Sequence, residues 1–102
     1  MSFNSLSPAR RQLVSLFQEW NFARVEGLRI RGGEPVLDPL PRRIREYKFN
    51  AENGPRQEAR LVDFQLKPQL LDLFRLFDEL GSGTIDVITL KHGLPFSAEF
   101  PA

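Results

Sequence analysis

Residues 8–36 have the sequence PARRQLVSLFQEWNFARVEGLRIRGGEPV, and residues 68–96 have the sequence PQLLDLFRLFDELGSGTIDVITLKHGLPF. The two stretches align without a gap, and the order of helix-forming, turn-forming and proline positions agrees. They share seven identical residues, where ordinary composition gives about two by chance. We therefore predict an internal duplication with repeats 8–37 and 68–97. The identical residues, numbered in the first stretch, are Pro8, Leu13, Leu16, Phe17, Glu19, Gly33 and Pro35.

Each repeat predicts a helix followed by a β-hairpin. Ser7 is a good N-cap, and Pro8 suits the first helical position because its missing N–H would have no partner there. Apolar residues then follow at spacings of three and four, which predicts a helix over about 8–20. The second repeat predicts a helix over 68–80 and strands over 84–90 and 95–100.

The first hairpin is predicted from alternation and from its glycines. Leu28 and Ile30 alternate with arginines, as in a half-buried strand, and Gly32-Gly33 supplies the positive φ of a tight turn. Val25 is out of phase with Leu28, which predicts a β-bulge near Gly27, and near Val87 in the second repeat. The alternative is a strand that is buried on both faces.

The residues between the repeats have no counterpart in either copy. Residues 42–49 predict an extra strand, and the polar, turn-rich residues 50–63 predict a long loop. Together these elements predict an α+β fold made of duplicated α-β-β units. One antiparallel sheet of about five strands would carry two helices on one face, within a single domain over 1–102.

Composition restricts the class of protein. At 102 residues, with 41% hydrophobic and 26% charged residues, the chain is in the ordinary globular range. It has no cysteine, which excludes disulfides and thiol catalysis. It shows neither a secretory leader nor a membrane-length apolar run, so we expect a cytoplasmic protein with no membrane partner.

Catalytic and metal-binding patterns are weak. His92 is the only histidine, and its position in the predicted turn favours a structural role over catalysis. Asp78, Glu79 and Asp86 are more simply interpreted as surface charges or partners of arginines than as a cation site. We therefore predict no enzyme activity, no metal site and no cofactor.

The two halves of the chain differ in charge. Residues 1–50 carry nine Lys and Arg against five Asp and Glu, a net +4, and residues 51–102 carry a net −3. This difference suits self-association or an acidic partner. If the first hairpin and the extra strand are neighbours, a basic and aromatic face results, which would suit nucleic acid. The alternative is that these arginines pair with Glu26, Glu34 and Glu46. The candidate face comprises Arg24, Arg29, Arg31, Arg43, Arg45, Tyr47 and Lys48.

The helix predicted over 68–80 is unusually apolar. Its polar stripe is narrow, so we predict that it is more buried than the helix over 8–20. Leu71 and Leu76 lie at the margins of its core-facing side and are candidates for a dimer interface. The sequence thus favours a non-enzymatic binding or assembly module that forms a homo-oligomer or binds another protein. The alternative is a nucleic-acid-binding module.

Overall fold

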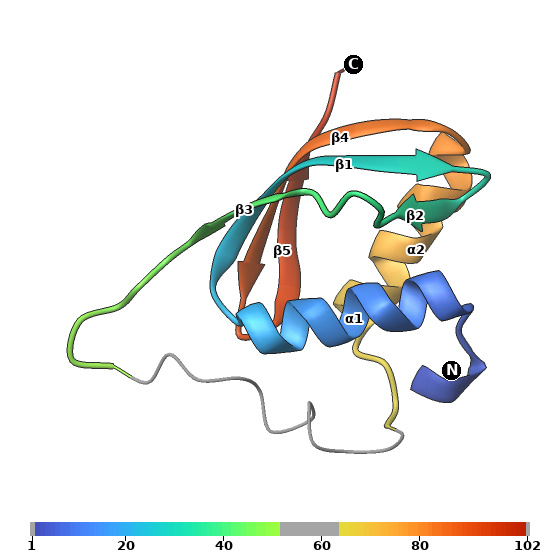
Figure 1. Cartoon of the computed structure of the whole chain (residues 1–102). Helices are drawn as coiled ribbons and strands as arrows, with labels where there is room; N and C mark the ends of the chain where they lie inside the picture. The colour runs from blue at the N-terminus through green and yellow to red at the C-terminus, as the bar shows by residue number, and fades with distance from the viewer. Residues whose placement is uncertain (1, 52–63, 102) are drawn as a thin grey trace.

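The computed structural model describes residues 2–51 and 64–101 (Figure 1). Its strands form one antiparallel five-stranded sheet in the order β2-β1-β4-β5, and β3 pairs with β1 outside this path. The elements in chain order are a 3-10 helix at Phe3–Ser5, α1 at Pro8–Trp20, β1 at Ala23–Arg31, β2 at Glu34–Val36, β3 at Arg42–Arg45, α2 at Pro68–Leu80, β4 at Gly83–Lys91 and β5 at Leu94–Glu99.

The α+β fold class is confirmed, with two helices and a five-stranded antiparallel sheet. Both long helices have 13 residues, and each is followed by a strand of nine residues. The helices and strands therefore have matching order and spacing in the two halves. The internal duplication itself stays a prediction, because matching lengths do not establish a common origin.

Both helices end in the same tight turn. Asn21 after α1 has φ 61 and ψ −68, and Gly81 after α2 has φ 69 and ψ −73. In each turn the next residue donates its N–H to the last helical carbonyl, Phe22 to Trp20 at 2.7 Å and Ser82 to Leu80 at 2.8 Å. This is the rare positive-φ form of the γ-turn. It turns the chain from helix into strand within two residues.

The core lies between one face of the sheet and the two helices. On each side of Gly27, alternate residues of β1 point into it. Val25, before Gly27, and Leu28, after it, are both fully buried. Phe17 of α1 and Phe77 of α2 are also fully buried in the same cluster, so both helices cover the same face. The opposite face of the sheet carries mainly exposed polar side chains and is called the open face below.

The alternation of buried residues in β1 changes phase near Gly27, as predicted. The predicted bulge, however, is absent from the pairing of β1 with β4. Gly27 has φ 71, and the buried positions shift from Val25 to Leu28 across it. The β1–β4 pairing nevertheless keeps one register on both sides, since β4 changes phase at the same point, between Ile85 and Ile88. A register shift occurs instead between β4 and β5, where Thr89 pairs with Ser97 and Leu90 with Pro95, so Phe96 is an extra residue.

The extra strand is shorter than predicted. β3 ends at Arg45, so residues 46–49 of the predicted strand 42–49 are not part of the sheet. β2 and β3 follow one another along the same edge of β1, separated by a segment with a cis peptide bond before Pro39 (Figure 1). Residues 52–63, most of the predicted loop 50–63, lie outside the described residues.

The prediction that the second helix is more buried than the first is wrong. α1 buries five side chains and α2 buries four, although α2 is the more apolar helix. Leu71, Leu76 and Leu80 of α2 remain only partly buried. The helix therefore keeps apolar surface that residues 2–51 and 64–101 leave partly uncovered.

Each hairpin turn is hydrogen-bonded to the helix of the other unit. Gly33 of the β1–β2 turn donates its backbone N–H to the carbonyl of Gly81, at 2.7 Å. Gly93 of the β4–β5 turn donates to the carbonyl of Asn21, at 2.8 Å. These bonds occupy carbonyls at the two helix ends, which lack partners within their own helix.

A polar cluster reinforces the first of these contacts. The Arg10 guanidinium of α1 donates to the Gly33 carbonyl at 2.9 Å and to Asp78 of α2 at 2.6 Å. Its Cζ atom also lies 5.0 Å from the centre of the Phe74 ring. On the other side, Glu34 accepts a hydrogen bond from the Ser7 hydroxyl at 2.5 Å. Arg10 thus links both helices to the first turn.

We predict that Gly33→Ala destabilises the protein more than Gly32→Ala. Both glycines have positive φ, so alanine at either site costs about 1 kcal/mol for the backbone alone. A Cβ at Gly33 would lie 3.0 Å from the Asp78 carboxylate and 3.6 Å from the Arg10 guanidinium, whereas one at Gly32 meets nothing within 4 Å. Displacing that ion pair should add about 1 kcal/mol. Urea unfolding measures the free energy of unfolding of both variants. Equal losses of stability would show that the Arg10–Asp78 contact does not constrain the turn.

A second prediction concerns the core. Phe77→Ala should lower the free energy of unfolding by about 3–5 kcal/mol, because it empties a fully enclosed site. Phe49→Ala removes the same ring from a position that is 88% exposed, and should change stability by less than about 0.5 kcal/mol. Thermal unfolding followed by circular dichroism compares the two. Similar midpoints for both variants would contradict the position of the core.

Candidate interaction surface

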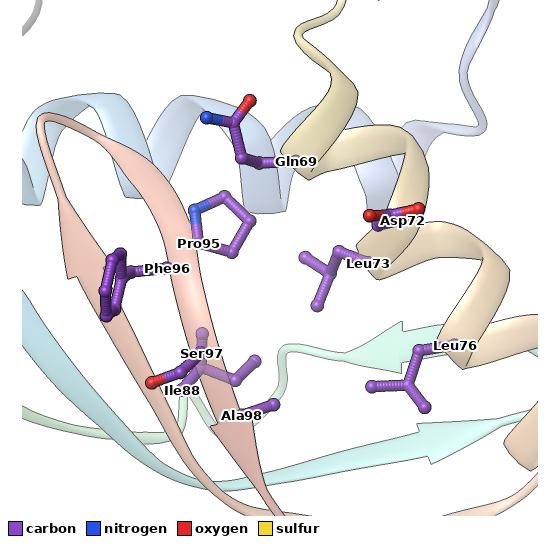
Figure 2. A pocket seen from close by; sticks show the side chains of 9 residues that line it. All are labelled: Gln69, Asp72, Leu73, Leu76, Ile88, Pro95, Phe96, Ser97 and Ala98. Atoms are coloured by element: carbon purple, nitrogen blue, oxygen red, sulfur yellow. The ribbon is translucent and has the colours of Figure 1, made fainter.

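An apolar groove of about 190 Å³ lies between α2 and β5. Figure 2 shows Leu73 and Leu76 extending from α2 toward Pro95 and Ala98 of β5, with Gln69 and Asp72 along the helix border. Phe96 and Ser97 line the strand side, and Ile88 of β4 lines the groove as well. The groove therefore has an apolar interior and a polar helix border. We call it the α2–β5 groove.

The spacing of residues along α2 and the register shift between β4 and β5 together form this groove. Gln69, Asp72, Leu73 and Leu76 are separated by three and four residues, so they share one side of α2. On β5, Pro95 pairs with buried Leu90, and Ala98 pairs with buried Ile88. Directly opposed residues share a face of the sheet, which places Pro95 and Ala98 on the helix side. Both walls are consequently apolar.

The apolar surface continues from the groove to the β4–β5 turn. A second hollow there shares Gln69, Pro95 and Phe96 with the groove and adds Lys91, His92 and Leu94. Phe96 is 65% exposed, and the Lys91 ammonium lies 3.9 Å from the centre of its ring. The exposed phenyl ring therefore lies where the two hollows meet.

The two leucines predicted for a dimer interface do not lie together. Leu76 lines the α2–β5 groove, whereas Leu71 packs against the core without lining it. Five residues separate them, which is about 140° around a helix. Leu76 remains a candidate interface residue, and Leu71 does not belong to this surface.

The predicted arginine face is divided between the two sides of the sheet. Arg24, Arg29 and Arg31 lie on the open face and are exposed. Arg43 and Arg45 pair with the inward residues Val25 and Ala23, so they project to the helix side. In agreement with this, Arg43 Cζ lies 5.3 Å from the Trp20 ring centre at the end of α1. β1 and β3 are neighbours, which is the condition that the arginine face requires, but their register does not form one continuous arginine face.

The remaining residues of the predicted face lie beyond β3. Tyr47 is 61% exposed, and its ring centre lies 5.5 Å from that of Phe49. The Lys48 ammonium lies 4.1 Å from the centre of the Phe22 ring. These side chains follow the end of the strand and are not part of the sheet surface.

The acidic residues predicted to neutralise the arginines have different partners. Glu26 lies 3.3 Å from Arg24 and 3.7 Å from Arg42 of β3, as the cross-strand alternative predicted. Glu34 instead lies 3.8 Å from Arg10 of α1. Glu46 lies 4.0 Å from Lys48, within its own segment.

The polar groups considered for chemistry have structural contacts. His92 occupies the β4–β5 turn with φ 56, and its ring meets the Phe22 ring edge-on at 4.8 Å. Asp78 binds Arg10, as expected for a partner of an arginine. Across residues 2–51 and 64–101, no group of three or more His, Cys, Asp or Glu side chains is placed to hold a metal ion.

Sequence reasoning missed Phe96 and Pro95 as surface-forming residues. Pro95 indicated an edge strand, but the extra residue that exposes Phe96 depends on the pairing with β4 and has no local sequence pattern.

Within the described ranges, no helix has the length and hydrophobicity needed to cross a membrane. Comparisons with family models, curated proteins and solved structures give no match.

Proposed function

We propose that this protein is a non-enzymatic assembly module that forms a homodimer through the α2–β5 groove. The observation that carries the proposal is the exposed Phe96 ring beside the apolar groove, at the edge of the sheet. Phe100, which follows β5, is 42% exposed and adds a second ring near the same strand. Clustered apolar surface of this kind is typical of protein interfaces.

The composition of the surface supports a protein partner. Interface centres are enriched in aromatic residues and depleted in charge, and their rims are polar. The groove has this arrangement, with leucine, proline and phenylalanine inside and Gln69 and Asp72 at the border. A chain of 102 residues buries a modest core, so association would also add to its stability.

The proposal predicts a dimer that depends on Phe96. At micromolar concentration, sedimentation or light scattering should give twice the 11.7 kDa mass of one chain. Phe96→Ser should raise the dimer dissociation constant by at least about tenfold, since a central aromatic residue contributes more than about 1.4 kcal/mol. Phe49→Ser is the matched control: it removes an even more exposed ring from outside the groove. A monomeric wild-type protein, or equal effects of both variants, would refute the proposal.

A nucleic-acid-binding module is the second candidate, supported by exposed Arg24, Arg29 and Arg31 on the open face. Arg29 and Arg31 have no ion-pair partner among the described residues, so they are the better test positions. Arg29→Glu with Arg31→Glu should abolish binding to DNA or RNA at about 50 mM salt, where phosphate contacts are strong. Arg43→Glu with Arg45→Glu is the control for the helix side. If the wild-type protein gives no retarded complex in gel-shift assays, the second candidate is excluded.

A further inference from the structure

We infer that the homodimer forms by antiparallel pairing of β5 with β5 of a second copy, around a twofold axis near Ser97. The inference rests on the proposed function and specifies its geometry. β5 is the last strand of the sheet, and no described residue pairs with its outer side. Two such edges pairing through their backbones would join the two five-stranded sheets into one.

The two edges of the sheet differ in how they are protected. The edge formed by β2 and β3 has strands of three and four residues, separated by a segment that contains Pro39 and Pro41. Three of the four β3 residues are arginines. Short strands, proline and charge all prevent edge-to-edge association. This edge is therefore poorly suited to pairing.

The β5 edge lacks this protection at its centre. β5 has six residues, and its central segment, Phe96-Ser97-Ala98, contains neither a charge nor a proline. All three residues are at least partly exposed. Pro95, which lacks a backbone N–H, lies outside the central segment. Because the central residues are uncharged and no described residue pairs with their outer side, this segment can act as a template for another strand.

The charges at the ends of β5 favour an antiparallel second copy. Lys91, the last residue of β4, pairs with Leu94 at one end of β5, and Glu99 lies at the other end; both charged side chains are exposed. A twofold axis near Ser97 brings the basic end of each copy beside the acidic end of its partner. A parallel arrangement would instead place like charges together. The same rotation brings the Phe96 rings and α2–β5 grooves of both copies to the junction.

Single cysteines test this geometry directly, because the chain has none of its own. Directly opposed residues of an antiparallel pair have Cα atoms about 4.5–5.5 Å apart, which is within the range that a disulfide requires. Ser97 lies at the proposed axis and is directly opposed to its own counterpart, so Ser97→Cys should give a covalent dimer under mild oxidation at micromolar protein. Ala98 is opposed to Phe96 of the second copy and not to itself, so Ala98→Cys should cross-link more slowly than Ser97→Cys. Ser15→Cys, at an exposed position on α1, is the control and should cross-link at least about tenfold more slowly. Sedimentation of each reduced variant establishes whether it is dimeric before oxidation.

The outcomes separate the inference from the proposed function. Rapid cross-linking of Ser97→Cys, with slower cross-linking of Ala98→Cys and of Ser15→Cys, supports β5 pairing about this axis. If the reduced variants are dimers but cross-link no faster than Ser15→Cys, the copies associate elsewhere; the inference fails and the assembly proposal stands. If the wild-type protein is a monomer at every concentration tested, both fail. Circular dichroism checks that each variant has the wild-type fold, and Ser97→Cys exchanges an exposed side chain for one of similar size.

Discussion

The fold depends on the backbone hydrogen bonds by which each hairpin turn contacts the helix of the other unit. Gly33 binds the carbonyl of Gly81, and Gly93 binds that of Asn21, residues that are themselves sixty positions apart. In the structure these backbone groups are paired between the two units and not within one of them. The two halves therefore complete each other, and one half alone would leave helix carbonyls without partners. Arg10 adds a side-chain link at one of these two contacts.

The sequence predicted those features that follow from local rules. Pro8, Pro68 and Gly81 mark helix ends because their backbones allow few alternatives, and the structure has α1 and α2 at the predicted positions. The five-stranded sheet likewise follows from alternation and turn residues. The shortened β3 was missed, because the pattern Arg42–Phe49 alternates beyond the point where β1 offers a partner.

The candidate sites were predicted less well, because side-chain direction in a sheet depends on register. Gly27 changes the phase of β1, and β3 pairs so that Arg43 faces Trp20 on the helix side. A single strand pattern contains neither fact. Leu76, predicted at a margin of its helix, lines the groove toward β5, whereas Leu71, predicted together with it, does not. Phe96 required the register shift between β4 and β5.

The interrupted strand pair β2 and β3 has a consequence for how far association can proceed. A protein with two open sheet edges joins head to tail and grows into a fibre, whereas one with a single open edge stops when that edge is used. Here the proline-containing segment between β2 and β3 and the arginines of β3 close one end of the sheet. If β5 joins two copies, both outer margins of the combined sheet carry this closed edge. Growth then terminates at two chains, and the arginines of β3 act as solubility determinants of the pair.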